Sequence, residues 1–211
     1  YIELQKRQIA KSPIDVRLNT EVTPELAKSL RPDAVIAAVG SDVVKPPIPG
    51  IDRENVFSGV EAFEDPARLK GKVLILGAGL VGTELAIYLK GLGVDVEIVE
   101  MGVEINDGGN MCHKIAVWDQ IIQKNIPIHF KTRAVEITDK GIRCEGPEGE
   151  VFFEADTVVC CAGMKPNREE ALKFYDAAPV FHMVGDCLQS ATILNATGTA
   201  YTVARFLGRY D

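Results

Sequence analysis

Long apolar runs and clusters of basic residues are both missing from this sequence. No run approaches the roughly 20 apolar residues that a membrane-spanning helix needs, and the first residues do not resemble a signal peptide. Lys and Arg together number 23 against 30 Asp and Glu, which gives a net charge of −7. Nucleic-acid binding needs clustered positive charge. We therefore expect a cytoplasmic protein that binds neither membrane nor nucleic acid.

Cysteine is scarce, and its spacing does not suit a redox or zinc site. No two cysteines form a C-x-x-C pair, and an odd number without regular spacing is typical of a reducing compartment. Cys112 and His113 are adjacent, but two neighbouring residues without further partners rarely bind a metal. We therefore expect no metal site. The cysteines are Cys112, Cys144, Cys160, Cys161 and Cys187.

One stretch has the pattern of a buried strand, a glycine turn and a helix. Val73 to Leu76 is a short apolar run, and a helix is expected from Leu80 to about Leu92. Between them lies a G-x-G-x-x-G pattern, in which the glycines permit a sharp turn, close approach of a pyrophosphate and tight helix packing. The helix N-terminus adds free N–H groups and partial positive charge. The residues expected to bind the pyrophosphate are Gly77, Ala78, Gly79, Leu80, Val81 and Gly82.

An acidic residue follows the next expected strand. Val94 to Val99 alternates as a strand and ends at Glu100, about twenty positions beyond the glycines. We expect Glu100 to accept hydrogen bonds from an adenosine ribose 2′-OH and to repel the 2′-phosphate of NADP. Two plainer alternatives stay open: a glycine turn that binds nothing, and a solvated acid at a strand end.

The remaining chain alternates short strands with helices. Expected helices cover residues 2–11, 24–30, 66–71 and 111–124, and a C-terminal helix carries an apolar stripe from Ile193 to Leu207. Expected strands cover 14–18, 34–40, 126–130, 134–137, 141–144, 151–153, 157–163 and 180–184. Residues 101–110 have three glycines and little periodicity, so a loop is expected there.

Two segments of the chain echo each other. Ala34 to Gly40 and Thr157 to Gly163 are both apolar strands that end in glycine and follow an aspartate. With 211 residues the chain has room for two small domains, and the echo suggests two nucleotide-binding lobes. The chain begins at Tyr1 and not at Met, so we expect a piece of a longer or processed chain.

The chain resembles the pyridine-nucleotide flavoprotein oxidoreductases. The segments that carry the resemblance stand in the family's order: the two echoing strands, Ile48-Pro49-Gly50, the glycine motif and Val184-Gly185-Asp186. The stretch from Gln5 to Thr23 resembles the old-yellow-enzyme-fused NADH:flavin oxidoreductases related to 2,4-dienoyl-CoA reductase and trimethylamine dehydrogenase. The resemblance implies an α/β fold: a doubly wound, Rossmann-like NAD(P)-binding lobe at 65–170, inserted in a truncated FAD-binding-like lobe at 1–64 and 171–211.

The resemblance also implies cofactors and an activity. NADH would pass a hydride to FAD, and a missing N-terminal barrel domain with FMN and an iron–sulfur cluster would reduce an enoate or enoyl-CoA-like substrate. Because the chain has a single G-x-G-x-x-G, we expect NAD binding to be retained, FAD binding to be weak or lost, and this piece alone to be inactive. The alternatives are a non-catalytic ADP- or NAD-binding module, and an NADH oxidase or disulfide reductase of the same superfamily.

Further residue roles come from the resemblance alone. On the NAD side it places Glu84 near the nicotinamide, Val135 beside the adenine and Gly163 close to the bound nucleotide; Glu84 could equally be only a helix-terminal charge. On the FAD side the resemblance implies that Asp186 hydrogen-bonds the ribityl chain. Alternatively, Asp186 only caps the following helix. The resemblance also implies that the backbone of Gly40 and of Val22 contacts the FAD. No catalytic side chain is expected, because the cofactors carry the hydride.

Overall fold

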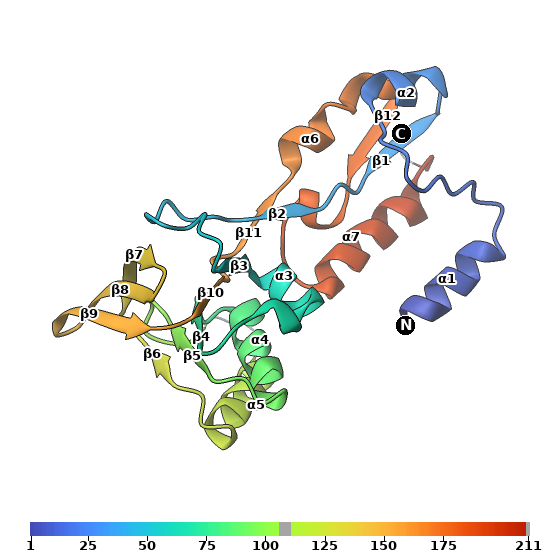
Figure 1. Cartoon of the computed structure of the whole chain (residues 1–211). Helices are drawn as coiled ribbons and strands as arrows, with labels where there is room; N and C mark the ends of the chain where they lie inside the picture. The colour runs from blue at the N-terminus through green and yellow to red at the C-terminus, as the bar shows by residue number, and fades with distance from the viewer. Residues whose placement is uncertain (106–110, 210–211) are drawn as a thin grey trace.

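The computed structural model describes residues 1–105 and 111–209, and its largest sheet has five parallel strands (Figure 1). The order across this sheet is β3-β10-β4-β5-β6, with every neighbouring pair parallel. The strands are β3 (Val56–Ser58), β4 (Val73–Leu76), β5 (Val96–Val99), β6 (Ile128–His129) and β10 (Thr157–Cys160). The loop expected at 101–110 lies partly outside the described residues.

β4 is the centre of this sheet and is buried on both faces. Val73 and Ile75 pack with α3 (Gly59–Glu64), α4 (Leu80–Gly91) and α5 (Met111–Gln123) on one face. Leu74 and Leu76 pack on the other face against a three-stranded antiparallel meander. The meander strands are β7 (Arg133–Thr138), β8 (Gly141–Gly146) and β9 (Gly149–Glu154). Burial on both sides explains the uninterrupted apolar run of β4.

A second group of elements surrounds a two-stranded parallel sheet, β1 (Ala34–Ala37) with β12 (Val180–Met183). We call it the two-stranded lobe, and the group around β4 the five-stranded lobe. The buried core of the two-stranded lobe is small, with Ala37, Ala171 and Cys187 at its centre. The strand expected at 34–40 is present as β1 but ends at Ala37, and the Ile36 side chain is exposed. The other elements of this lobe are α2 (Pro24–Ser29), α6 (Arg168–Leu172), η2 (Tyr175–Ala177), η3 (Gly185–Cys187) and α7 (Ile193–Phe206).

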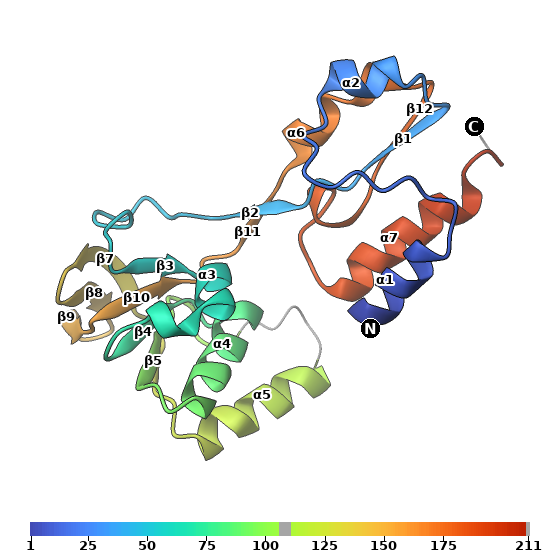
Figure 2. The same cartoon turned by 45° about the vertical axis from the view of Figure 1, so that its right-hand side comes forward.

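The two lobes are joined by a short antiparallel ribbon, β2 (Ser41–Val43) with β11 (Met164–Pro166), which lies between them in both views (Figures 1 and 2). β3 and α3 precede residue 65 but belong to the five-stranded lobe, and Ala171 is in the core of the other lobe. The division expected at residue 65 would assign β3 and α3 to the other lobe, and the division expected at residue 170 would cut α6. We propose instead that the chain crosses between the lobes at β2 and β11.

A local sequence signal places the start of α2 correctly. The Thr23 side chain accepts a hydrogen bond from Leu26 N at the start of α2, as its capping role predicts. The helix expected after Asp65 is only a single 3₁₀ turn, η1 (Pro66–Arg68). α1 (Ile2–Ala10) forms as expected but buries no residue, and the same is true of α7, so the apolar stripe of α7 is not covered within the described residues.

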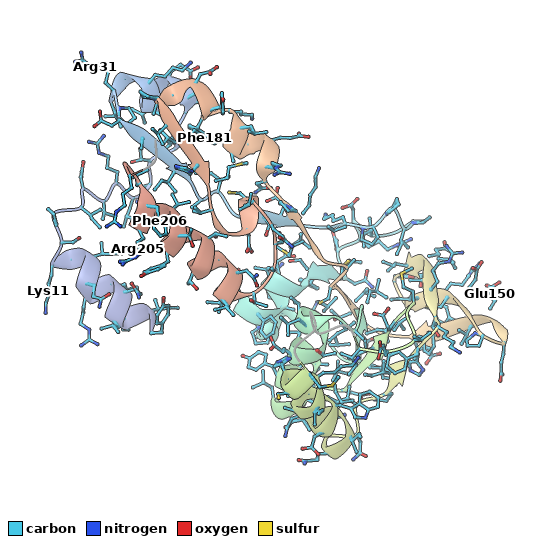
Figure 3. The ribbon with its side chains drawn as sticks, turned by 180° about the vertical axis from the view of Figure 1, so that it is seen from behind. Lys11, Arg31, Glu150, Phe181, Arg205 and Phe206 are labelled. Atoms are coloured by element: carbon cyan, nitrogen blue, oxygen red, sulfur yellow. The ribbon has the colours of Figure 1, made fainter. Side chains whose placement is uncertain are left out.

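The strand expected at 14–18 is wrong. Residues 14–17 are irregular, and Ile14, Val16 and Leu18 are exposed. Alternating apolar residues form a strand only when a neighbouring strand supplies hydrogen bonds, and none of the described strands lies alongside. Figure 3 shows Lys11, near this segment, and Glu150, near the β8–β9 turn, at opposite ends of the molecule. Among the described helices none has the length and apolar character to cross a membrane.

Candidate nucleotide-binding site

The turn after β4 requires glycine at two positions. Gly77 has a left-handed φ of +107°, and a Cβ there would lie 2.6 Å from the carbonyl oxygen of Cys161 on the neighbouring strand end. At Gly82 a Cβ would lie 2.0 Å from the carbonyl oxygen of Gly77. A side chain at either site would push backbone atoms apart. The structure thus assigns Gly77 to the turn and Gly82 to the close packing of α4 on that turn.

The N-terminus of α4 is suited to an anion. Gly79 precedes the helix in an extended conformation and offers no side chain to cap it, and the first turn carries no acidic residue. The buried Thr83 side chain bonds the Gly79 and Leu80 carbonyl oxygens and leaves the first-turn N–H groups alone. A 12-residue helix with an uncapped start presents N–H groups and partial positive charge, which together bind phosphate.

Glu100 is attached directly to the glycine turn. Its Oε2 accepts a hydrogen bond from Ala78 N at 2.6 Å, and its Oε1 accepts one from Gly102 N at 2.5 Å. The Glu100 carboxylate therefore lies at the glycine turn, although Glu100 and Ala78 are 22 positions apart in the sequence. A carboxylate has about four lone-pair sites, so acceptor capacity is left for a ribose hydroxyl. The alternative of a merely solvated strand-end acid is wrong, because both oxygens bond backbone N–H groups; the ribose role stays a prediction.

Glu84 faces a partner that the sequence did not indicate. Its Oε1 lies 3.1 Å from Nε2 of His113, the third residue of α5. The pair joins α4 to α5 on the side of α4 near its N-terminus. The contact spans 29 positions of sequence, and no local pattern at Glu84 or His113 predicts it. The role of Glu84 beside a nicotinamide stays a prediction.

Gly163 and Val135, the two other residues expected to contact the NAD nucleotide, lie in segments that are connected to the glycine turn. Gly163 has a φ of +110° with open space around it, two residues beyond Cys161, whose carbonyl oxygen abuts Gly77. Val135 lies in β7 where the pairing with β8 shifts register. The start of β7 is connected to Glu100, because Thr132 N donates to the Glu100 carbonyl oxygen at 2.9 Å. The fold thus brings these segments toward one site.

The flavin-side residues are only partly brought together. Gly40, Asp186 and Thr192 line an open cavity of about 470 Å³ between the ends of β1 and β12 and the start of α7. Asp186 Oδ2 lies 3.4 Å from the Ser41 hydroxyl that donates to it. Thr192, not Asp186, caps α7, so the capping alternative for Asp186 is wrong for that helix. Val22 is exposed and does not line this cavity.

This cavity fits one side of a flavin nucleotide better than the other. Asp186 offers a carboxylate beside the Ser41 hydroxyl, which suits the hydroxyls of a ribityl chain. A pyrophosphate needs a strand–glycine–helix turn, and the part of the chain that the structure describes holds one such turn, at Gly77. The two-stranded lobe therefore fits the ribityl side of FAD and not its phosphates.

The cysteines do not form a redox pair. All five are free thiols, and burial raises the pKa of Cys161 to about 12 and that of Cys144 to about 11. At such pKa values the thiolate is scarce near neutral pH, and the thiolate is the reactive form. Cys160 and Cys161, the one adjacent pair, serve as strand and turn residues beside β4.

Comparison with known proteins decides the family. The family model for pyridine nucleotide-disulphide oxidoreductases matches residues 4–181. The chain belongs to this family. Its mixed α/β, Rossmann-like fold and its kinship with oxidoreductases are thereby confirmed, whereas a place in the 2,4-dienoyl-CoA reductase branch is not.

Curated relatives of this pyridine nucleotide-disulphide oxidoreductase are much longer proteins. Bilirubin reductase of Mediterraneibacter gnavus is 30% identical over 92% of this chain and 30% of its own. NADH oxidase of Thermoanaerobacter brockii is 30% identical over 93% of this chain and 31% of its own. The chain thus spans just under a third of these relatives' length.

A solved structure aligns over almost the whole chain. It is 2-naphthoyl-CoA reductase in complex with 2-naphthoyl-CoA, with a TM-score of 0.87, 28% identity, and coverage of 95% of this chain and 31% of that chain. Both lobes and the ribbon between them therefore have a counterpart in a reductase of a CoA thioester.

Proposed function

We propose that these residues form the nucleotide-binding part of an NADH-dependent flavin oxidoreductase. The observation that carries the proposal is the turn from Gly77 to the uncapped start of α4, with Glu100 attached to it at Ala78. Gly77 and Gly82 keep side chains away from the turn, the first N–H groups of α4 bind the pyrophosphate, and Glu100 accepts from the ribose. Bound NADH supplies the hydride; these residues bind and orient it.

Preference for NADH over NADPH follows from charge at the ribose edge. A 2′-phosphate would meet the Glu100 carboxylate at short range, and like charges there are unfavourable. Met101, the next residue, is exposed and uncharged, so it offers no cation to offset that repulsion. The similarity to an NADH oxidase supports the same preference.

The electron acceptor and the final substrate lie beyond these residues in our proposal. Asp186 and Gly40 would face the ribityl side of FAD in the longer protein, where a further segment supplies the phosphate-binding turn. A barrel domain with FMN and an iron–sulfur cluster would be the partner within the same chain. Similarity to a 2-naphthoyl-CoA reductase supports an enoate or enoyl-CoA-like substrate class. On this proposal the 211 residues alone bind nucleotide but do not reduce that substrate.

One alternative has a specific observation in its favour. The two-stranded lobe has a small core and only the ribityl side of a flavin site, whereas the glycine turn of the five-stranded lobe is complete. A non-catalytic module that holds ADP or NAD as a structural ligand would need only the complete turn. An NADH oxidase or a disulfide reductase of the same superfamily is the other alternative, and the similarity to an NADH oxidase supports it.

Calorimetric titration with NADH, NADPH, ADP and FAD, each alone, tests the proposal. We expect NADH to bind at least tenfold more tightly than NADPH, and FAD to bind weakly. ADP binding as tight as NADH would favour the structural-ligand module, because the nicotinamide would then add nothing. No binding of any dinucleotide, in a chain shown to be folded by circular dichroism, would overturn the proposal. Asp186→Ala is the matched control, since it should leave NADH binding unchanged.

A further inference from the structure

Cys161, the residue after β10, forms part of the glycine turn that follows β4. Its backbone N–H donates to the Leu76 carbonyl oxygen at 2.8 Å, which ties the ends of the two strands together. Its own carbonyl oxygen would lie 2.6 Å from a Cβ at Gly77. The backbone of Cys161 is therefore one wall of the turn, although Cys161 stands far from the G-x-G-x-x-G pattern in the sequence.

The Cys161 side chain lies between the first turns of α3 and α4. A Cβ at Gly59, the first residue of α3, would lie 2.9 Å from the Cys161 Sγ. A Cβ at Gly82, the third residue of α4, would lie 3.3 Å from the Cys161 Cβ. The two helices lie side by side in both views (Figures 1 and 2). Each helix thus has a glycine where it meets Cys161, and neither contact leaves room for a further atom.

Size, and not charge, determines what this thiol can do. Burial raises the pKa of Cys161 to about 12, so the side chain is a neutral thiol near neutral pH. A neutral thiol packs as a small hydrophobic group. Val81 of α4 closes the same contact, since its Cγ1 would lie 3.0 Å from a Cβ at Gly59. A larger group at position 161 would therefore push α3 and α4 apart.

The two helix starts beside Cys161 differ in what they offer a ligand. Ser58 and Glu61 form a capping box at the start of α3, so the backbone N–H groups of these two residues are already bonded. α4 follows Gly79, which has no side chain to cap it, and its first N–H groups are available to an anion. An anion is therefore bound by α4, and α3 is the neighbour against which α4 packs through Cys161.

We propose that Cys161 is a positioning residue of the nucleotide site: its side chain sets the distance between α3 and α4 and so places the N-terminus of α4 behind the glycine turn. The inference rests on the proposed function for its ligand. α4 cannot move toward the turn to make room, because a Cβ at Gly82 would already lie 2.0 Å from the Gly77 carbonyl oxygen. A larger side chain would displace the first N–H groups of α4, and hydrogen bonds to phosphate weaken steeply when their geometry is disturbed.

Cys161→Val tests this role, since valine keeps an atom at the place of the sulfur and adds a second γ carbon. It should weaken the binding of NADH and of ADP about tenfold or more, and by the same factor, because both ligands contain the pyrophosphate. Cys161→Ala adds no atom and should keep both affinities within about threefold. Calorimetric titration measures the affinities, and circular dichroism confirms the fold of each variant.

Cys144→Val is the matched control. Cys144 is fully buried in the core between the sheet and the meander, away from the glycine turn. Overpacking at Cys144 should lower stability and leave the NADH and ADP affinities unchanged. Unchanged affinities in a folded Cys161→Val chain would overturn the proposal. So would an equal loss of affinity in Cys144→Val, because binding would then follow general stability.

A second measurement needs no ligand. Gly59→Ala places a methyl group against the Cys161 sulfur and should lower the urea midpoint of unfolding by about 0.5 M or more. In a Cys161→Ala chain the sulfur is gone, so Gly59→Ala should lower the midpoint by about half as much or less. Gly91→Ala, with nothing within 4 Å of its new Cβ, should act equally in both chains.

An equal loss for Gly59→Ala in both chains would overturn the packing of Cys161 against α3 and with it the proposal. Failure of the proposed function gives a different result. In that case the unmodified chain binds neither NADH nor ADP, while the effects of Gly59→Ala and Cys161→Ala on the urea midpoint still depend on each other.

Discussion

The backbone N–H of Ala78 donates a 2.6 Å hydrogen bond to the carboxylate of Glu100. Ala78 belongs to the glycine turn that follows β4, and Glu100 ends the neighbouring strand β5, so the bond joins the two expected parts of the nucleotide site. The second carboxylate oxygen bonds Gly102 N, which extends the connection to the next loop. The Glu100 side chain thus links the glycine turn, the end of β5 and the following loop.

Glu100→Ala should weaken NADH binding about tenfold or more, because it removes a charged acceptor worth about 1.5–3 kcal/mol. It should also narrow the preference for NADH over NADPH, and Met101→Arg should narrow it further. Calorimetric titration of both nucleotides measures these changes. Glu104→Ala is the control acid, since its contact is an exposed pair with Lys114. Equal NADH and NADPH affinity in the unmodified chain would show that Glu100 has no ribose role.

Gly82→Ala should lower the free energy of unfolding by about 2–4 kcal/mol, since the new Cβ would lie 2.0 Å from the Gly77 carbonyl oxygen and something in the backbone must move. Gly91→Ala, in the same helix, has nothing within 4 Å of the new Cβ and should be neutral or stabilising by up to about 1 kcal/mol. Urea denaturation compares the two, and similar effects at both sites would refute close packing at Gly82.

Glu97 should make stability depend on acid pH. Burial alone raises its pKa, but hydrogen bonds from Lys72 at 2.6 Å and from His129 at 2.8 Å outweigh this, so its pKa lies below the ordinary value of 4.5. A lowered pKa gives stability that is present above about pH 4.5 and is lost as the pH falls through the folded value.

Glu97→Gln should therefore cost about 1–2 kcal/mol at pH 7, and the difference from the unmodified chain should shrink below pH 4.5. Urea denaturation from pH 3 to 7 measures it. Glu145→Gln, whose exposed carboxylate pairs with Arg133, is the control and should change little. A pH-independent difference for Glu97→Gln would contradict the ionised network.

Alkylation should separate the cysteines by exposure and pKa. Cys112 is exposed on α5 and should react with iodoacetamide within minutes at pH 8. Cys161 and Cys144, with pKa values of about 12 and 11, should stay unlabelled in the folded chain and react only after denaturation. Mass spectrometry of the labelled peptides counts the sites. Rapid labelling of Cys161 would show that its surroundings are more open than described.

The glycine turn was predictable because its chemistry is local. Strand, glycines and helix follow one another within Val73–Gly91, and the close approaches at Gly77 and Gly82 leave a direct mark in residue type. The strand expected at 14–18 failed for the opposite reason: alternation is local, but a strand forms only if a distant segment supplies its hydrogen bonds. The crossing that we propose at β2 differs from the boundary expected at residue 65, because β3, before residue 65, pairs with β10 a hundred residues later.

The sequence by itself determined the strand–glycine–helix turn, the acid after the second strand and the family resemblance, since each depends on residues close together in the chain. Only the tertiary structure decided that Glu100 bonds Ala78, that Glu84 meets His113 and that the lobes are joined by β2 and β11. It alone showed which side of α5 is buried, with Val117 and Ile121, and which side is exposed. Those relationships depend on which surfaces meet after folding, and helical periodicity marks an apolar face without saying what covers it.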